Sequence, residues 1–248
     1  MRESVMKGAE AFYKEGNEIG IVVLHGFTGT TQSMRPLAEA YAKEGYTVVC
    51  PKLIGHGTTP EDMEQSTAEE WIQSAENAFA WLENRCNRIF VVGLSLGGTL
   101  SLYLAANKNV DGLAVINPAV NVPEMVQMAK SELRFVDSIG SDIKKKDVSE
   151  LTYHKTPVRS LKHLRNLMAK VHEQLSEVKA PMIVFVSEED HVVPPDNGQT
   201  VFDMAFSEEK ELVHLENSYH VATLDNDQDL IIERCLEFFS RHVNAKVE

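Results

Sequence analysis

The chain has 248 residues, of which 43% are hydrophobic and 25% are charged. This composition is ordinary for a globular protein and excludes a disordered or collagen-like chain. Its 24 basic and 37 acidic residues give a formal net charge of −13, which would repel nucleic acids and anionic membrane surfaces. We therefore expect neither as a partner. The length predicts one domain, which can carry an inserted subdomain.

The three cysteines are widely spaced, and their odd number predicts free thiols in a reducing compartment and not a disulfide framework. Residues 1–20 carry four glutamates and lack an apolar run, which argues against a signal peptide and a membrane span. We expect a cytoplasmic protein without stable membrane insertion. It can be a monomer or a homodimer.

Short β-branched runs alternate with amphipathic stretches, as is typical of a parallel sheet covered by helices on both faces. Six strands are expected, at Ile19 to Leu24, Thr47 to Cys50, Arg88 to Val92, Gly112 to Ile116, Met182 to Val186 and Glu211 to Leu215. Helices are expected near Met34 to Glu44, Ala68 to Asn84, directly after Ser95, near Asp196 to Phe206 and near Gln228 to His242. The sequence therefore predicts an α/β fold with a mostly parallel central sheet.

Residues 121–179 interrupt this alternation between the fourth and fifth expected strands, and their pattern is helical with no convincing strand. We expect them to form a small helical cap, inserted into a core made of residues 1–120 and 180–248. Loops at the carboxyl ends of parallel strands commonly bind ligands. Some apolar side chains of the cap should therefore line a substrate pocket.

A G-x-S-x-G pattern, Gly93-Leu94-Ser95-Leu96-Gly97, lies between an expected strand and an expected helix. In a nucleophile elbow, the two glycines let the strand and the helix pack closely while the serine hydroxyl projects outward. The strand before the pattern and the helix after it make it specific. The sequence predicts that Ser95 attacks a carbonyl group.

A serine hydroxyl needs a general base, and the base needs a third group to orient it. On this fold the chain order is serine, acid, histidine. His220 follows the last expected strand and is the predicted base. The acid should follow the preceding strand, where Glu189 and Asp190 lie. Asp190 is favoured and Glu189 is the alternative, because the loop must advance a few residues before it reaches the imidazole.

Two backbone N–H groups must stabilise the oxyanion, one from the residue after the nucleophile and one from the loop after the first core strand. This rule assigns Leu96 and Phe27. His25, in the same loop as Phe27, is expected to brace it, and His56 is given a structural role. The sequence lacks an H-E-x-x-H pattern, a Walker A loop and a G-x-G-x-x-G fingerprint, so we expect no metal site and no cofactor.

Six segments carry a resemblance to a known family: His25 to Gly29, Ser33 to Leu37, Gly55 to Gly57, Gly93 to Gly98, Asp190 to Pro195 and Asn217 to Asp225. Together they resemble the α/β-hydrolase superfamily and, within it, the small monoacylglycerol lipases and carboxylesterases of bacilli. The resemblance implies an α/β-hydrolase fold with a small helical cap. It also implies a triad of Ser95, Asp190 and His220, with an oxyanion hole formed by Phe27 and Leu96.

One position departs from the family that the chain resembles. The resemblance implies an acidic cap residue that helps to hold the glycerol hydroxyls, and His154 occupies the matching position here. A neutral imidazole can make a hydrogen bond there, but it is not a fixed anionic acceptor for two hydroxyls. His154, Met125 and Ile139 are the cap residues that we expect to contact the substrate.

The expected function is hydrolysis of monoacylglycerols or related short-to-medium-chain acyl esters by a serine esterase that forms an acyl-enzyme. One alternative is a general carboxylesterase without a preference for glycerol. The other is a non-catalytic α/β-hydrolase scaffold that senses a ligand, although such a scaffold usually lacks a triad residue. Haloalkane dehalogenases and epoxide hydrolases are disfavoured, because they need a carboxylate nucleophile at the position of Ser95.

Overall fold

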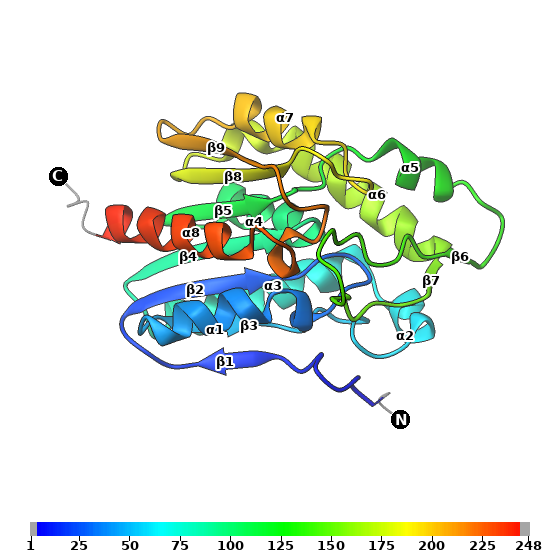
Figure 1. Cartoon of the computed structure of the whole chain (residues 1–248), viewed down its shortest axis with the longest axis horizontal. Coiled ribbons are helices and arrows are strands. Elements are labelled where there is room, and N and C mark those ends of the chain that lie inside the picture. Colours follow the sequence, from blue (N-terminus) through cyan, green and yellow to red (C-terminus); the bar gives the residue numbers. More distant parts are fainter. Residues whose placement is uncertain (1–3, 244–248) are drawn as a thin grey trace.

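The computed structural model describes residues 4–243, and at its centre lies a seven-stranded sheet in the order β1-β3-β2-β4-β5-β8-β9 (Figure 1). The strands are β1 (Phe12–Lys14), β2 (Ile19–Leu24), β3 (Thr47–Cys50), β4 (Arg88–Leu94), β5 (Gly112–Ile116), β8 (Met182–Ser187) and β9 (Lys210–Leu215). Neighbouring strands pair in parallel, except β1, which pairs antiparallel with β3. The mostly parallel sheet and its six expected strands are confirmed, and β1 is an additional strand.

Helices cover both faces of this sheet (Figure 1). On one face α1 (Arg35–Lys43) packs against α8 (Gln228–Val243), and on the other lie α3 (Ala68–Glu83), α4 (Leu96–Asn107) and α7 (Asp196–Met204). These five helices were all expected. The short helix α2 (Pro60–Gln65) was not.

The start of α3 shows how the sequence fixes a helix end. The side-chain oxygen of Thr67 accepts a hydrogen bond from the N–H of Glu70 at 3.3 Å. The carboxylate of Glu70 accepts one from the N–H of Thr67 at 2.9 Å. This reciprocal capping box satisfies two N–H groups that would otherwise lack a partner at the helix end. It sets the point at which α3 begins.

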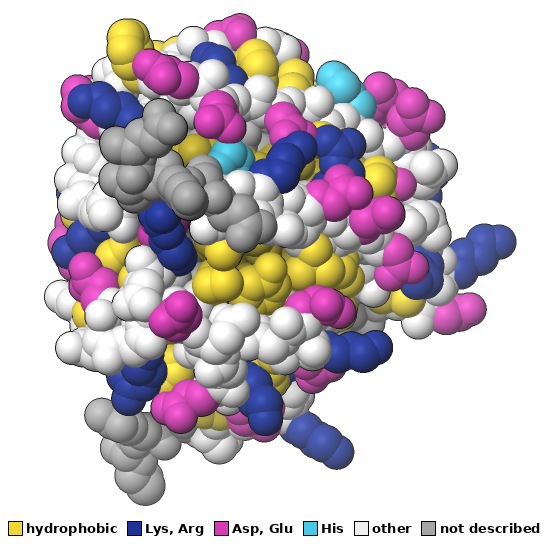
Figure 2. Space-filling model, turned by 90° about the vertical axis from the view of Figure 1, so that its left-hand side faces the viewer, with side chains coloured by type: hydrophobic (Ala, Val, Ile, Leu, Met, Phe, Trp, Pro, Cys, Tyr) yellow, Lys and Arg dark blue, Asp and Glu magenta, His cyan; other side chains and the backbone are white. Residues whose placement is uncertain are grey.

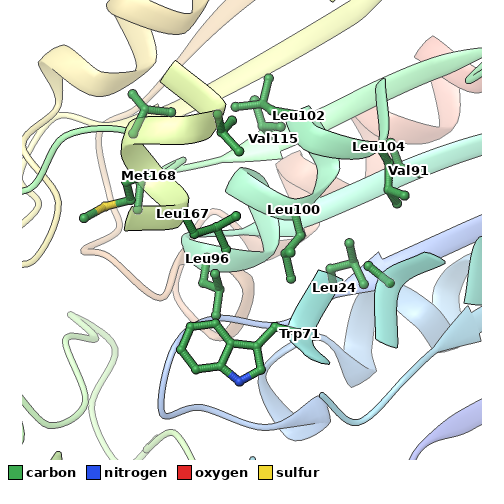
Figure 3. Packing of buried hydrophobic residues seen from close by; sticks show 14 of the residues in the cluster. Leu24, Trp71, Val91, Leu96, Leu100, Leu102, Leu104, Val115, Leu167 and Met168 are labelled. Carbon is green, nitrogen blue, oxygen red and sulfur yellow. The ribbon is translucent and has the colours of Figure 1, made fainter. Parts of the chain in front are cut away.

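Helix α4 follows the predicted nucleophile elbow and is buried between the sheet and the helices α3 and α6 (Val158–Glu173). Leu96, Leu100 and Leu104 of α4 have no exposed surface. Figure 3 shows Leu96 and Leu100 close to Trp71 of α3, with Leu167 of α6 nearby. A helix that is apolar on all sides must be buried. Ser95 directly precedes α4 and is therefore attached to a tightly packed helix.

The inserted segment lies between β5 and β8, at the carboxyl ends of the strands (Figure 1). It contains α5 (Pro123–Met128), α6 and a two-stranded antiparallel sheet made of β6 (Phe135–Asp137) and β7 (Lys155–Pro157). The expectation of an insertion without strands was therefore wrong. Each of these strands has only three residues, and one ends in a proline, so neither gives a recognisable strand pattern.

Figure 2 shows the face on the left of Figure 1, away from the insertion. Basic and acidic side chains are intermixed on it, around a group of hydrophobic side chains near its centre. Nucleic-acid binding relies on clustered basic residues. Among the described residues, this face shows no continuous basic surface of that kind.

Candidate active site

Ser95 lies in the turn between β4 and α4. Its φ of 55° and ψ of −116° are rarely adopted by residues other than glycine. Its N–H donates to the carbonyl of Ile116 at 2.9 Å, and its carbonyl accepts from the N–H of Thr99 at 3.0 Å. The end of β5 and the first turn of α4 therefore hold this strained serine in place.

Gly93 and Gly97 are required here because backbone atoms approach them closely. A Cβ atom on Gly93 would lie 2.1 Å from the carbonyl oxygen of Gly97. A Cβ atom on Gly97 would lie 2.0 Å from the carbonyl oxygen of Leu24 in β2. Backbone atoms cannot rotate away as the end of a side chain can. The two glycines of the pattern thus permit the close packing of strand, turn and helix.

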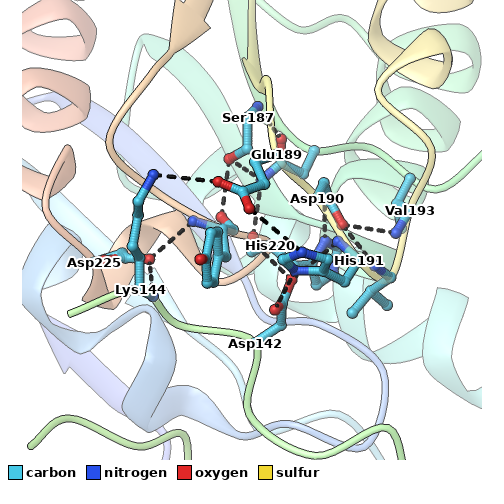
Figure 4. Close-up of polar contacts among 12 residues, drawn as sticks. Asp142, Lys144, Ser187, Glu189, Asp190, His191, Val193, His220 and Asp225 are labelled. Atoms are coloured by element: carbon cyan, nitrogen blue, oxygen red, sulfur yellow. Dashed lines mark hydrogen bonds and ion pairs between the residues drawn. The ribbon is translucent and has the colours of Figure 1, made fainter. Parts of the chain in front are cut away.

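His220 and Asp190 come together from the loops after β9 and β8 (Figure 4). Nδ1 of His220 lies 2.7 Å from Oδ2 of Asp190, whose side chain is 1% exposed. The other oxygen of Asp190 accepts from the N–H groups of Val192 and Val193, each at 2.8 Å. The backbone therefore holds one carboxylate oxygen while the other faces the imidazole. Ser95 and His220 line the same cavity.

Glu189, the alternative acid, makes different contacts (Figure 4). Its carboxylate lies 3.3 Å from Nζ of Lys144 and 3.7 Å from Nε2 of His191. More than half of its side chain is exposed. The structure brings Asp190, and not Glu189, to the imidazole of His220.

The pKa of His220 reflects opposing influences. Burial disfavours the charged imidazolium and would lower the pKa, but the carboxylates of Asp190, Glu150 and Asp142 outweigh this effect. The hydrogen bond to Asp190 acts in the same direction, and the pKa of His220 is raised. A base in this environment readily holds the positive charge that it acquires when it takes a proton.

Phe27 follows β2, and Leu96 is the first residue of α4. Within residues 4–243, neither backbone N–H has a protein acceptor. The loop of Phe27 is shaped by Thr28, which has a φ of 61° and whose Oγ1 donates to the carbonyl of Phe27 at 2.6 Å. Oγ1 of Thr152, from the insertion, lies 3.1 Å from the carbonyl oxygen of Thr28. Two free amides therefore flank the elbow, as an oxyanion hole requires.

His25 and His56 are buried and braced by the backbone. Nε2 of His25 accepts from the N–H of Leu53 at 3.2 Å, and its Nδ1 donates to the carbonyl of Gly26 at 3.0 Å. Burial lowers the pKa of His25 to about 4 and that of His56 well below its usual range. Both are therefore neutral, and His25 ties the loop after β2 to the loop after β3.

A cavity lies between the elbow and the insertion. The insertion contributes apolar side chains and polar ones to its wall. They are Met125, Met128, Ile139 and Leu161 on the apolar side, and Ser138, Glu150 and Thr156 on the polar side. The structure thus places Met125 and Ile139 at the cavity, and the mixed wall can accommodate an amphiphilic molecule.

Glu150 also lines this cavity, although no sequence pattern predicted a role for it. Gln32 holds the backbone on both sides of it. Nε2 of Gln32 donates to the carbonyl of Ser149 at 3.2 Å, and its Oε1 accepts from the N–H of Leu151 at 2.9 Å. The N–H of Glu150 itself donates to Oγ of Ser141 at 2.9 Å. These bonds fix the point at which the side chain enters the cavity.

Burial raises the pKa of Glu150 to about 7, although the charge of His220 and a hydrogen bond with Ser33 oppose the rise. This carboxyl group changes its charge near neutral pH, and it interacts electrostatically with His220, the predicted base. A single acid in a charged segment is normally solvated. No local sequence pattern could therefore have identified Glu150.

His154 is exposed and does not belong to the residues that line the cavity. Its backbone carbonyl accepts from the N–H of Ser138 at 3.2 Å, and this contact places it at the end of the β6–β7 pair with its side chain towards solvent. The expected substrate contact of His154 therefore stays a prediction, and in this structure the side chain lies outside the cavity lining. The carboxyl group that the insertion brings to the cavity is that of Glu150.

The cysteines Cys50, Cys86 and Cys235 are free thiols, as the sequence predicted. Among residues 4–243, no group of three or more His, Cys, Asp or Glu side chains could hold a metal ion. None of the helices in this described part of the chain is long and apolar enough to cross a membrane.

The order of the sheet strands changes direction between β2 and β4, and ligands of open α/β sheets bind at such a point. Ser95 follows β4 and Phe27 follows β2, so both lie at this crevice beside the His220–Asp190 pair. These features define a serine hydrolase of the α/β-hydrolase class, in the esterase and lipase group. Residues 17–227 match the family described as serine aminopeptidase, S33. The chain belongs to this family of α/β-hydrolases.

Individual relatives agree with this assignment. The chain is 54% identical over 242 residues to the thermostable monoacylglycerol lipase of Bacillus sp. (strain H-257), covering 96% of this chain and 97% of that protein. It is 27% identical to the carboxylesterase of Bacillus subtilis (strain 168), over 93% of this chain and 96% of that one. A solved structure from work on the metagenome-derived lipolytic enzymes LipS and LipT superposes with a TM-score of 0.94 at 47% identity. That match covers 96% of this chain and 100% of the other.

Proposed function

We propose that this chain hydrolyses monoacylglycerols and related short-to-medium-chain acyl esters through an acyl-enzyme on Ser95. The observation that carries the proposal is the 2.7 Å contact between Nδ1 of His220 and Oδ2 of Asp190, beside the cavity that Ser95 lines. With Nδ1 donating to Asp190, the imidazole has Nε2 as its acceptor. It can then take a proton from a serine hydroxyl.

In the proposed reaction, His220 takes the Ser95 proton while Oγ attacks the ester carbonyl. The N–H groups of Phe27 and Leu96 stabilise the negative charge that develops on the carbonyl oxygen. His220 then gives its proton to the departing alcohol. A water molecule next gives a proton to His220 and attacks the acyl-enzyme, which releases the fatty acid and restores the Ser95 hydroxyl.

The cavity wall supports an ester that has both an acyl chain and a polar alcohol. The side chains of Met125, Ile139 and Leu161 can pack against the acyl chain, and the carboxyl group of Glu150 is available to hydroxyl groups. Similarity to the monoacylglycerol lipase of Bacillus supports glycerol as that alcohol. The exposed position of His154 favours the second candidate, a general carboxylesterase without a glycerol preference.

The nucleophile is tested by replacing Ser95 with Ala and measuring hydrolysis of a p-nitrophenyl ester. We expect turnover to be abolished, and we expect a fluorophosphonate probe to label the wild-type protein but not the variant. Folding of the variant is checked by thermal unfolding. A folded Ser95→Ala variant that keeps most of its activity would contradict the proposed mechanism.

The substrate is tested with monoacylglycerols of graded chain length, compared with alkyl esters of the same acyl chains. We expect a higher kcat/KM for the glycerol esters, and we expect Glu150→Gln to reduce this preference more than His154→Gln does. The exposed His154 is the matched control, because it lies in the same segment but outside the cavity lining. Equal kcat/KM values for both ester types would favour the general carboxylesterase.

A further inference from the structure

The catalytic loops contact a carboxylate that the proposed mechanism does not use. Asp142 lies in the insertion between β6 and β7, and its side chain is 12% exposed. Its Oδ2 accepts from the N–H of His220 at 3.1 Å and from the N–H of His191 at 3.1 Å. Its Oδ1 lies 2.8 Å from Nδ1 of His191. One side chain of the insertion thus contacts both loops that meet in the His220–Asp190 pair (Figure 4).

The backbone of Asp142 also holds the loop of His220. Its carbonyl accepts from the N–H of Val221 at 3.0 Å, so two consecutive amides of the loop bond to one residue. From the side of the sheet, Nδ2 of Asn117 donates to the carbonyl of His220 at 2.8 Å. The backbone of His220 is therefore held between the end of β5 and the insertion.

Asp225 fixes the segment that carries Asp142. Its carboxylate accepts from the N–H groups of Lys144 at 2.6 Å and Lys145 at 2.9 Å. It also accepts from the N–H of Tyr219 at 2.9 Å, and Asp225 is 1% exposed. Tyr219 directly precedes His220, so the insertion is bonded to the histidine loop at several neighbouring points. A movement of the Asp142 segment would have to break these bonds or carry the loop with it.

We propose that Asp142 is a positioning residue for the reaction of Ser95, His220 and Asp190, so that the insertion forms part of the catalytic machinery as well as covering the cavity. This inference rests on the proposed function. A displacement of about 1 Å in a catalytic group can cost about 10²-fold in rate. Asp142 does not line the cavity. Its loss should therefore lower kcat and change KM little.

The charge of Asp142 gives this role a signature that a purely structural contact lacks. His220 faces three carboxylates, those of Asp190, Glu150 and Asp142, and each raises the pKa of its imidazole against the effect of burial. The base must be neutral to accept a proton, so the acidic limb of the kcat/KM profile reports its pKa. Removal of the Asp142 charge should shift this limb to lower pH.

The experiment compares Asp142→Ala, Asp142→Asn and the control Asp147→Asn in the full-length enzyme, with a p-nitrophenyl ester as substrate. Asp147 lies in the same segment, is exposed, and has a φ of 61°, which asparagine also tolerates. Asp147→Asn therefore removes one negative charge, as Asp142→Asn does, but at a residue that does not contact the catalytic loops. Active-site titration with a fluorophosphonate counts the competent enzyme, so that kcat is normalised to folded protein.

We expect Asp142→Ala to lower normalised kcat about 10²-fold with KM within threefold of wild type. We expect Asp142→Asn to shift the acidic limb of the kcat/KM profile to lower pH. We expect Asp147→Asn to leave both kcat and the position of this limb unchanged. If Asp142→Ala does not fold, the pH profile of Asp142→Asn, which keeps an acceptor oxygen, decides the matter. A kcat within twofold of wild type in Asp142→Ala, or an unshifted limb in Asp142→Asn, overturns the inference.

The same assay with Ser95→Ala separates this inference from the proposed function. Activity that persists in Ser95→Ala contradicts the proposed function itself. An inactive Ser95→Ala beside a fully active Asp142→Ala contradicts only the positioning role.

Discussion

A Cβ atom on Gly29 would lie 2.4 Å from Oε1 of Glu150 and 3.2 Å from its Cδ. Gly29 does not have a positive φ, so this position requires space and not an unusual backbone conformation. The glycine that closes the His25 to Gly29 segment therefore makes room for the carboxyl group of the insertion. This contact couples the loop of the proposed oxyanion hole to the polar side of the cavity.

Gly29→Ala should consequently have the same effect on substrate preference as Glu150→Gln. In each variant we expect the ratio of kcat/KM for a monoacylglycerol over its alkyl ester to fall about tenfold, which corresponds to one lost hydrogen bond of about 1.4 kcal/mol. In the double variant this preference should fall little further than in either single variant, because both changes disturb the same contact between the Glu150 carboxyl group and the substrate. Fully additive losses would show that Gly29 and Glu150 act independently.

The ionisation of Glu150 should be visible in the stability of the protein. Burial raises its pKa from 4.5 to about 7, so between these values the unfolded chain releases a proton that the folded protein retains. Stability from this group is therefore fully present below pH 4.5 and is lost as the pH rises towards 7.

Urea unfolding of wild type and Glu150→Gln at several pH values checks this prediction. Relative to wild type, we expect the variant to gain on the order of 1 to 3 kcal/mol of unfolding free energy between pH 4.5 and 7. Above pH 7 the difference should stay constant. A difference that does not change with pH would mean that the carboxyl group of Glu150 is not desolvated in the folded protein.

The sheet and the elbow could be predicted from sequence because both depend on neighbouring residues. β-branched runs such as the one that forms β4 mark buried parallel strands, and the pattern around Ser95 places the turn directly after one. The rule for chain order then selects His220 and Asp190. By contrast, β1 has only three residues and a poorly buried pattern, which is too little for a periodicity to appear.

The contributions of the insertion could not be predicted because they depend on residues far apart in the chain. Asp142 contacts His191 and His220, which lie 49 and 78 residues further along the chain. The carboxyl group of Glu150 occupies space that Gly29 leaves free on another loop. Both acids lie in a polar segment whose composition is typical of a solvent-exposed surface. Only the folded chain reveals what they contact.

The two glycines after Ser95 offer a matched test of the elbow. A Cβ on Gly97 would lie 2.0 Å from a backbone oxygen, whereas a Cβ on Gly98 would meet Pro118 at 3.1 Å. We expect Gly97→Ala to lower the unfolding free energy by about 3 kcal/mol, at the upper end of the usual cost of overpacking. Gly98→Ala should cost about 1 kcal/mol, since alanine also favours the helix. Chemical denaturation measures both, and equal costs would contradict the proposed packing.

Two variants of Asn117 can separate the effect of backbone strain from that of side-chain hydrogen bonds at the loop of His220. It is buried with a φ of 45°, its Nδ2 donates to the carbonyl of His220 at 2.8 Å, and its Oδ1 accepts from the N–H of Ser187 at 2.8 Å. Asn117→Gly removes these bonds and relieves the strain, whereas Asn117→Ala removes the bonds and adds strain. The unfolding free energy of Asn117→Ala should therefore be about 1–2 kcal/mol lower than that of Asn117→Gly.

Both variants should show the same loss of kcat, because both leave the His220 carbonyl without the side-chain donor that follows β5. Urea unfolding measures the difference in stability, and ester hydrolysis normalised by active-site titration measures kcat. If alanine lowers kcat much more than glycine does, the backbone conformation at Asn117, and not its side-chain bond, positions the histidine. If neither variant lowers kcat, the contacts from the insertion alone hold the loop of His220 in place.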